Sequence, residues 1–227
     1  MTRDLLFQPS IRNAIQTLAG RFADDGRTVT VIQVGACNGN IRNDPVQEII
    51  KGNDYISAHL VEAVSWLYED LVQIMAPHSD YIQCYNLAIG ARDEVRKFFY
   101  VSERYQEDHP DAAEWKKYQI GSLTDQHLKR WIPDEYIEAV EVQCMSPGTL
   151  LKIANVRPRD LNLLVVDAEG FDGQIVTGFL EITRPEMIVY EHKIMSAEEN
   201  EKLCALMGGF TYGFRKIGED MLAVRVP

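Results

Sequence analysis

The sequence predicts an α/β fold with a doubly wound, mostly parallel sheet that ends in an antiparallel hairpin. Continuous apolar runs such as VTVIQVG at 29–35 and LNLLVVDAEG at 161–170 are typical of strands buried on both faces of a sheet. Helical segments alternate with these runs, which implies right-handed crossovers between parallel strands. The closing segment, FTYGFRKIGEDMLAVRVP, contains two strand-like runs around a turn at Ile217–Asp220, and it predicts the hairpin.

The chain begins with a predicted N-terminal helical cap over residues 1–28. Ser10 is a typical N-cap residue, and apolar side chains recur after it at helical spacing. Beyond the cap, the predicted strands are 29–35, 55–62, 81–89, 95–101, 140–145, 161–170 and 186–192. The predicted helices lie near 44–52, 65–76, 147–156, 172–180 and 196–207. The last of these begins with Ser196 and Glu199 at capping-box spacing.

Segment 102–135 interrupts this alternation. It is polar, carries Pro110 and Pro133, and has weak periodicity. We interpret it as an insertion or lid within a single domain that spans residues 1–227, because long irregular segments in compact domains often carry function. It could close over a substrate or form a contact in an oligomer, and the sequence leaves both open.

The composition disfavours several partners and compartments. The formal net charge is −11, and an acidic surface repels both nucleic acid and anionic membranes. No apolar run approaches the roughly 18 residues of a membrane helix, and the N-terminus lacks the pattern of a signal peptide. The four cysteines form no CxxC pair, which disfavours a zinc or redox motif. We therefore expect a cytoplasmic protein with reduced thiols.

Four of the predicted strands carry glycine or polar residues at their carboxyl ends. In open parallel sheets, ligands bind beyond the carboxyl ends of the strands, so these residues are expected to meet at one edge. Glycine permits positive φ and close approach of a ligand to the backbone. A carboxylate about 20 residues after such a loop commonly binds ribose hydroxyls. The residues concerned are Gly35 and Gly39, Glu62, Asp167 and Glu169, and Glu191 and His192.

The spacing of the first glycines narrows the choice of ligand. Gly35-x-x-x-Gly39 is not the G-x-G-x-x-G pattern of dinucleotide-binding folds, which disfavours NAD(P). The chain also lacks the G-K-S/T tripeptide of nucleoside triphosphate sites.

Five segments, in order, carry a resemblance to a known family: VIQVGACNGN, LVEA, NLAIG, LLVVDAEGFDGQIV and RPEMIVYEH. Together they resemble the FkbM family of S-adenosylmethionine-dependent methyltransferases over most of 29–226, and DAEG is the most specific part. The resemblance implies the Rossmann-like class I methyltransferase fold with a seven-stranded sheet. It also implies S-adenosyl-L-methionine as cofactor and O-methylation of a hydroxyl on a small molecule, such as a sugar or secondary metabolite.

The resemblance also implies which residues bind the cofactor. Backbone near the methionine and ribose would come from the first loop, Glu62 would hold the ribose diol, and the third strand would border the adenine. Asp167 would face the methionine end and the sulfonium. The implied set is Gln33, Gly35, Ala36, Gly39, Glu62, Asn86, Leu87, Ala88, Ser122 and Asp167. Gln33 stands where the family usually has an acid and Cys37 where it usually has Asn, and the sequence leaves open whether these changes weaken cofactor binding.

Three residues are predicted to act in catalysis. His192 is the candidate general base, because its ordinary pKa is near neutrality and it ends a strand. Glu169 would orient His192 or bind substrate hydroxyls, and Asp167 would serve the sulfonium or the substrate. His192 could equally be an ordinary strand-end residue. A divalent metal held by these acids is conceivable, but we predict no metal site.

Two other classes of function stay open from the sequence alone. The departures at Gln33 and Cys37 are compatible with a catalytically idle protein that binds S-adenosylmethionine or acts as a scaffold. An NAD(P)-dependent oxidoreductase is disfavoured by the glycine spacing. Turnover on hydroxylated small molecules would separate the methyltransferase from both.

Overall fold

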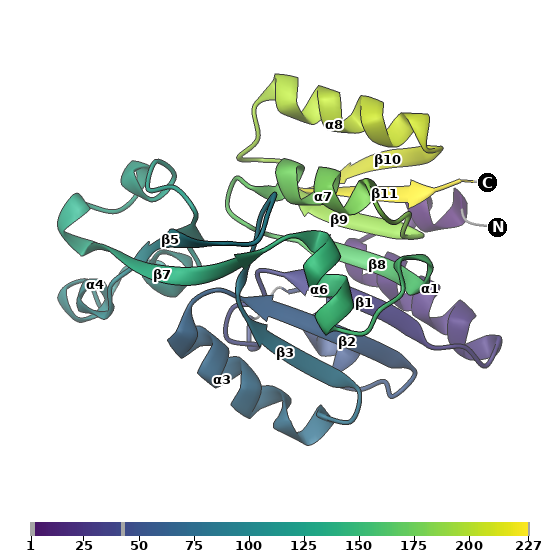
Figure 1. Ribbon diagram of the computed structural model, residues 1–227, viewed down its shortest axis with the longest axis horizontal. Coiled ribbons are helices and arrows are strands. Elements are labelled where there is room, and N and C mark those ends of the chain that lie inside the picture. The colour runs from purple at the N-terminus through teal and green to yellow at the C-terminus, as the bar shows by residue number, and fades with distance from the viewer. Residues whose placement is uncertain (1–2, 42–43, 227) are drawn as a thin grey trace.

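The computed structural model describes residues 3–41 and 44–226, and a seven-stranded sheet forms its centre (Figure 1). The strand order is β10-β11-β9-β8-β1-β2-β3, so the chain winds outward from β1 in both directions. All neighbouring pairs are parallel except those that involve β11. The predicted class I methyltransferase fold with its C-terminal antiparallel hairpin is confirmed. The strands are β1 (Val29–Val34), β2 (Ile56–Glu62), β3 (Ile82–Asn86), β8 (Leu161–Val166), β9 (Met187–Glu191), β10 (Tyr212–Ile217) and β11 (Asp220–Arg225).

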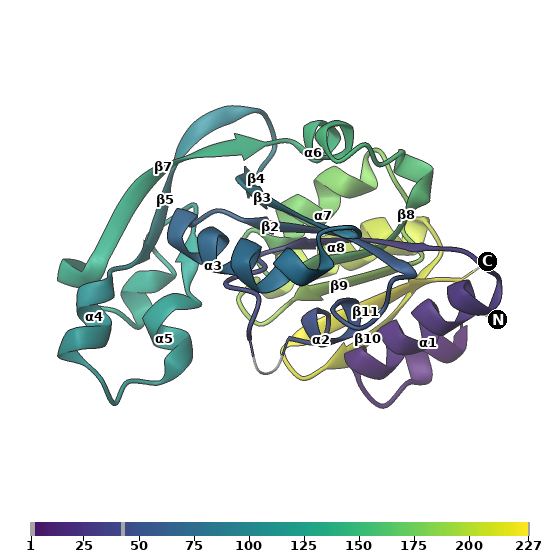
Figure 2. The same ribbon diagram turned by 90° about the horizontal axis from the view of Figure 1, so that it is seen from below.

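Helices cover both faces of this sheet, as its apolar strands require. Figure 2 shows α1 and α2 on one side and α6 on the other. Each face has its own apolar core, one built around α1 and the other around α7. The helices are α1 (Ile11–Asp24), α2 (Gln47–Ile50), α3 (Ser65–Met75), α6 (Pro147–Ile153), α7 (Asp172–Leu180) and α8 (Ala197–Gly209). Single 3-10 turns occur at Arg3–Phe7, Ala76–His78, Leu128–Arg130, Asp134–Tyr136 and Pro158–Asp160.

Local capping explains where two helices begin. The Ser10 side chain accepts a hydrogen bond from the Asn13 N–H and satisfies one free donor of the first turn of α1. Ser196 and Glu199 form the reciprocal capping box that their spacing predicts at the start of α8.

Two predicted strands, 81–89 and 161–170, are wrong in their extent. Residues 81–89 do not form a single strand, because the chain leaves the main sheet after Asn86. The side-chain amide of Asn86 donates to the backbone carbonyl oxygens of Glu62 and Ala63. The Leu87 N–H also donates to the Glu62 carbonyl oxygen. These bonds hold the chain at the end of β2. The following strand, β4 (Ala88–Ile89), joins a different sheet.

That second sheet has the order β4-β7-β5-β6 and continues beyond the carboxyl ends of the parallel strands. Its long antiparallel pair consists of β5 (Glu94–Val101) and β7 (Ile137–Met145), with β6 (Gly121–Ser122) at one edge. The DAEG segment is also a loop rather than the end of a strand, because β8 stops at Val166. Because β3 and β8 both end earlier than predicted, the chain that follows each of them lies over the carboxyl edge of the main sheet.

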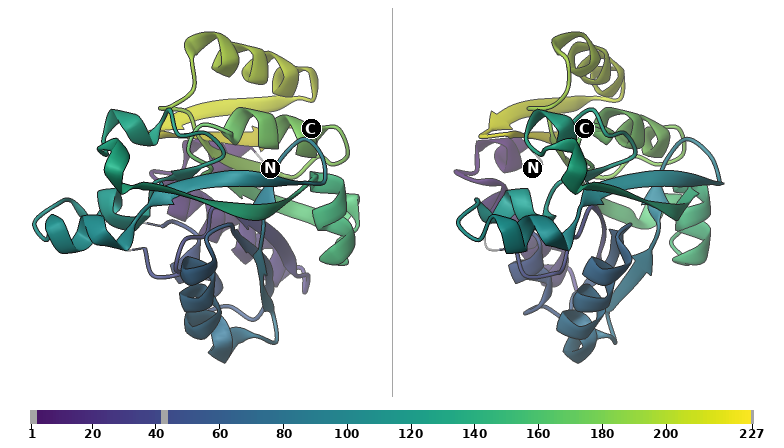
Figure 3. Two further views of the ribbon diagram at one scale, coloured as in Figure 1. Left: turned by 60° about the vertical axis from the view of Figure 1, so that its left-hand side comes forward. Right: turned by 90° about the vertical axis from the view of Figure 1, so that its left-hand side faces the viewer.

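The predicted insertion connects β5 to β7 and projects from this edge (Figure 3). It contains two short helices, α4 (Glu103–Asp108) and α5 (Glu114–Tyr118), and it has a small apolar core of its own. The buried members of that core are Val101, Tyr105, Ile120, Leu128 and Ile132. The segment is therefore packed internally, although its sequence pattern is weak.

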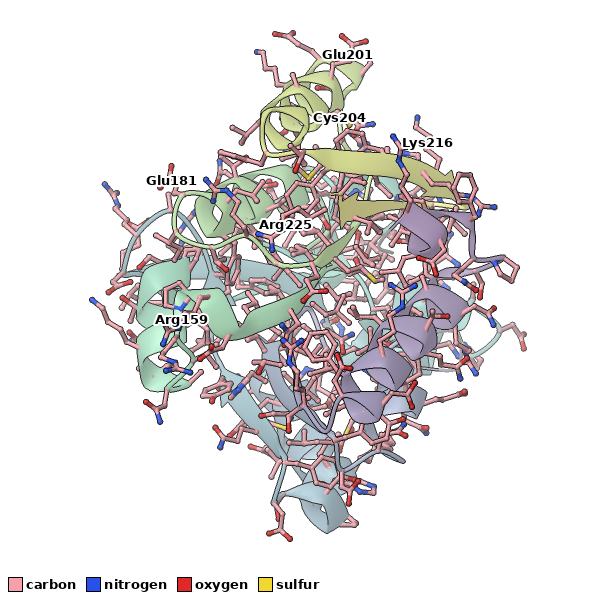
Figure 4. All side chains as sticks on the ribbon, turned by 90° about the vertical axis from the view of Figure 1, so that its right-hand side faces the viewer. Arg159, Glu181, Glu201, Cys204, Lys216 and Arg225 are labelled. Carbon is pink, nitrogen blue, oxygen red and sulfur yellow. The ribbon has the colours of Figure 1, made fainter. Side chains whose placement is uncertain are left out.

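The opposite end of the molecule is polar. Figure 4 shows exposed charged side chains there, among them Arg159, Glu181 and Arg225. None of the helices within the described ranges has both the length and the apolar character needed to span a membrane.

Candidate active site

A cavity of about 660 Å³ lies at the carboxyl ends of the parallel strands. The main sheet contributes the strand ends that the sequence predicted to meet, and the β5–β7 segment closes the other side with mostly apolar side chains. The lining includes Gln33, Gly35, Glu62, Asp167, Glu169 and Glu191 from the first group and Phe98, Tyr100, Ile120 and Leu123 from the second. Residues distant in sequence thus share one concave site, the usual form of a small-molecule site.

Gly35 occupies a position that no other residue fits. Its φ is +83°, and a Cβ built on it would lie 1.8 Å from the Asp167 carbonyl oxygen. The Gly35 and Ala36 N–H groups both donate to the Val61 carbonyl at 3.0 Å. The first loop is therefore held between the ends of β2 and β8, and its backbone lies directly against the cavity.

Glu62 fastens the same loop through its side chain. Oε2 accepts a hydrogen bond from the Cys37 N–H and Oε1 accepts one from the Val64 N–H, both at 2.8 Å. Burial raises the pKa of this carboxyl to about 7, although the backbone donors oppose the shift. A carboxylate oxygen has more than one acceptor position, so Glu62 can still accept hydrogen bonds from a ligand.

Gln33 and Asp44 form a pair in the cavity wall. Gln33 is 2% exposed, and its Nε2 donates to Asp44 Oδ2 at 2.5 Å. Gln33 Oε1 is buried and has no hydrogen-bond partner within the described residues. Such an orphaned acceptor is costly unless a ligand supplies a donor. Asp44 also accepts from the Val46 and Gln47 N–H groups, and burial raises its pKa.

Carboxyl groups gather around the loop after β8. Burial raises the pKa of Asp167 well above its ordinary value, and the nearby carboxylates of Glu169 and Asp172 raise it further. Burial likewise raises the pKa of Glu191 to about 8, with a contribution from Glu169. Asp172 accepts hydrogen bonds from the Ala168, Gly170 and Glu191 N–H groups, so it joins this loop to β9.

No lysine or arginine belongs to the cavity lining within the described ranges. The carboxyl-bearing residues of the lining are Asp44, Glu62, Asp167, Glu169, Glu191, Glu219 and Asp220. An enclosed site of this composition attracts cations and hydrogen-bond donors, and it repels anionic groups such as phosphates.

The sequence reasoning missed a contact made by the insertion. His127 Nε2 lies 2.9 Å from Glu169 Oε2, and both side chains are mostly buried. Ser122 Oγ donates to the Glu169 carbonyl oxygen at 2.9 Å. A lone histidine in a segment of weak periodicity carries no signal of such pairing, because nothing local relates residue 127 to residue 169.

The structure brings seven of the predicted site residues to the cavity wall: Gln33, Gly35, Glu62, Leu87, Ala88, Asp167 and Glu169. Four others lie behind it. Ala36 is fully buried, and Gly39 faces α3, where a Cβ would meet Leu71 Cδ1 at 2.8 Å. Asn86 and Ser122 bond to the backbone of wall residues. These four support the wall rather than line it.

His192 is not part of the wall, and it makes no hydrogen bond to Glu169 within the described residues. Glu191 is the last residue of β9 and lines the cavity, whereas His192 follows the strand and does not belong to the lining. The His192 N–H donates to the Glu219 carbonyl, and its Nε2 is buried without a partner in the described part of the chain. The expectation that Glu169 orients His192 is thus corrected: Glu169 pairs with His127.

A metal site was considered and not predicted from the sequence. Across residues 3–41 and 44–226, no group of three or more His, Cys, Asp and Glu residues is arranged to hold a metal ion.

Comparison with known proteins identifies one family model, described as the methyltransferase FkbM domain, which matches residues 33–216. No curated protein matches the chain. Among solved structures, the precorrin-6y C5,15-methyltransferase of Geobacter metallireducens is 7% identical with a TM-score of 0.44, and the alignment covers 94% of this chain and 89% of that one.

Two further solved structures are similar to the chain at a comparable level of identity. The human methyltransferase 10 domain containing protein is 10% identical with a TM-score of 0.45, covering 96% of this chain and 84% of that one. Aeropyrum pernix fibrillarin, solved with natively bound S-adenosyl-L-methionine, is 8% identical with a TM-score of 0.42, covering 87% and 67%.

Proposed function

Because the chain belongs to the FkbM family of S-adenosylmethionine-dependent methyltransferases, we propose that it transfers a methyl group to a hydroxyl of a small molecule. The observation that carries the proposal is the composition of the cavity. A glycine loop and Glu62 lie on one side of it, carboxyl groups lie at and just beyond the ends of β8 and β9, and mostly apolar side chains line the other side.

The cofactor half of the site would be formed by β1, β2 and the chain after β3. Gln33 Oε1, which has no partner among the described residues, is suited to accept a hydrogen bond from the methionine ammonium, and Asp44 would supply a carboxyl group beside it. Glu62 would accept the ribose hydroxyls, and Leu87 would contact the adenine. S-adenosylmethionine would supply a methyl group on a positively charged sulfur, and the acceptor hydroxyl would have to lose its proton to a base as its oxygen takes that methyl group.

The acceptor half would lie between β8, β9 and the insertion. Carboxyl groups form hydrogen bonds with hydroxyl groups, so Glu169, Glu191 and Asp220 favour a hydroxylated acceptor, and the lack of a basic side chain among the described lining residues disfavours an anionic one. Phe98 and Tyr100 would cover the apolar parts of the acceptor. Holding the two reactants in line can contribute about 7–11 kcal/mol to the barrier reduction. In this proposal the whole chain is one domain, and 102–135 serves as the lid.

Two measurements test the proposal. Titration calorimetry with S-adenosylhomocysteine is expected to detect binding, and methyl-labelled S-adenosylmethionine is expected to label at least one acceptor in a panel of polyols, glycosides and phenols. Binding without transfer to any acceptor would support the idle binding protein instead. Absence of binding would refute both. Activity that is lost in EDTA and restored by Mg²⁺ would contradict the absence of a metal from the proposed site.

A further inference from the structure

Glu169 is held at two points by one short stretch of the insertion. The His127 ring contacts its carboxylate, and the Ser122 hydroxyl donates to its carbonyl oxygen, each at 2.9 Å. An ionised carboxylate only accepts hydrogen bonds, so His127 must carry a hydrogen on Nε2 to make this contact. The side chains of His127 and Glu169 are 12% and 19% exposed, which shields the pair from water.

The backbone of Glu169 is strained where these contacts act on it. Its φ is +48°, in the left-handed region that side-chain-bearing residues rarely occupy. Such conformations persist only where surrounding contacts impose them, and they concentrate at functional sites. The contacts to Ser122 and His127 provide that constraint, and they direct Glu169 into the cavity wall.

The insertion is rigid enough to impose this geometry. His127 immediately precedes Leu128, which is fully buried in the small core of the insertion, and Ser122 lies on β6, which pairs with β5. His127 Nδ1 is also buried and has no partner within the described residues. A group left unsatisfied in this way lowers stability, so packing alone does not account for a histidine here.

From these contacts we propose that Glu169 takes the proton of the acceptor hydroxyl and that His127 is the residue that positions it. The inference rests on the proposed function and assigns the general base within it. As the hydroxyl oxygen bonds to the methyl carbon, its proton passes to a free lone pair of the Glu169 carboxylate, and the electron pair of the broken carbon–sulfur bond stays on sulfur. His127 acts through its hydrogen bond to Oε2. The position of Glu169 therefore depends on the insertion being packed against the loop after β8.

Variants of the full chain test this assignment. Glu169→Gln is expected to lower kcat by roughly 10²–10⁴, the usual contribution of a general base. His127→Leu removes the donor and is expected to lower kcat about 10- to 100-fold, as for a lost hydrogen bond to a charged group. His127→Gln keeps an N–H donor and should restore most of the loss. His109→Gln is the matched control, because that ring lies in the same insertion but packs against the rings of Tyr105 and Tyr136.

Measuring both kcat and the affinity for S-adenosylhomocysteine separates a positioning role of His127 from a merely structural one. Affinity for S-adenosylhomocysteine should stay at the wild-type value in all four variants, which also reports folding. If His127 acts through Glu169, His127→Leu has little further effect on kcat in the Glu169→Gln background. Ser122→Ala, which removes the second contact, replaces His127→Leu if that variant does not fold.

The outcomes distinguish this inference from the proposed function. Suppose that the wild type methylates an acceptor. The inference is then overturned, and the proposed function stands, if kcat is unchanged in His127→Leu or if the losses in kcat are fully additive in the Glu169→Gln, His127→Leu double variant. Failure of the wild type to methylate any acceptor of the panel refutes the function and the inference with it.

Discussion

Replacing Gly35 by alanine tests whether the first loop is built around a close backbone contact. The added Cβ would lie 1.8 Å from the Asp167 carbonyl oxygen, at a φ of +83°. The obstacle is a main-chain atom, so no side-chain rotation can relieve the contact. Gly35→Ala must therefore separate the glycine loop from the end of β8, and these are the two elements proposed to hold the cofactor and the reacting groups.

Two terms set the expected size of the effect. A residue with a Cβ at positive φ costs about 1–2 kcal/mol, and forcing extra volume into a packed site costs about 1–3 kcal/mol more. The free energy of unfolding should therefore fall by roughly 2–5 kcal/mol. For a protein of this length that corresponds to a decrease in Tm of roughly 4–20 °C. Displacement of the loop should also abolish measurable binding of S-adenosylhomocysteine.

Gly26 offers the matched control. Its φ is +65°, but no atom lies within 4 Å of the Cβ that an alanine would add, apart from its chain neighbours. Gly26→Ala should therefore show only the conformational cost of about 1–2 kcal/mol and retain the wild-type affinity for S-adenosylhomocysteine. Thermal denaturation and calorimetry on both variants give the comparison. Equal Tm values for the two, with wild-type affinity in Gly35→Ala, would refute the close-contact reasoning.

Three other predictions follow from the same geometry. Glu62→Gln places an amide donor against a backbone N–H and should raise the Kd for S-adenosylhomocysteine about 10-fold or more; a wild-type Kd would contradict the role of Glu62. Gln33→Leu removes the orphaned acceptor and should raise the same Kd about 10-fold, whereas no change would exclude Gln33 from the contact. Burial raises the pKa of Asp172 to about 7, of Glu191 to about 8 and of Asp220 to about 6. In this pH range the folded state holds protons that the unfolded state releases. The contribution of these groups to the free energy of unfolding is therefore complete below the ordinary carboxyl pKa and is lost as pH rises through the raised values. Denaturant titrations from about pH 5 to about pH 8 should show this loss, reduced in Glu191→Gln, and a rising profile would disprove it.

The elements of the main sheet could be predicted because their signals are local. Buried parallel strands appear as uninterrupted apolar runs, and α1 and α8 begin at the serines that the sequence pattern indicates. Polar residues directly after such strands must lie at the carboxyl edge of the sheet, which is why Gly35, Glu62 and Asp167 could be placed in the site.

The second sheet could not be predicted in the same way. An apolar run indicates a strand but not its partner, and residues 81–89 read as one strand although hydrogen bonds from Asn86 divide it. His192 shows the same limit at a single residue. It follows directly after β9, but the path of the chain there places Glu191 rather than His192 in the cavity wall.

The amino-acid sequence by itself determined the alternation of strands and helices in the main sheet, the family, and several chain segments that line the cavity, because periodicity and motif order are properties of neighbouring residues. Only the tertiary structure decided which side chains meet across long separations: Gln33 with Asp44, and His127 with Glu169. Pairs of this kind depend on register, loop conformation and the packing of the insertion. They arise only when distant segments are brought within hydrogen-bond distance.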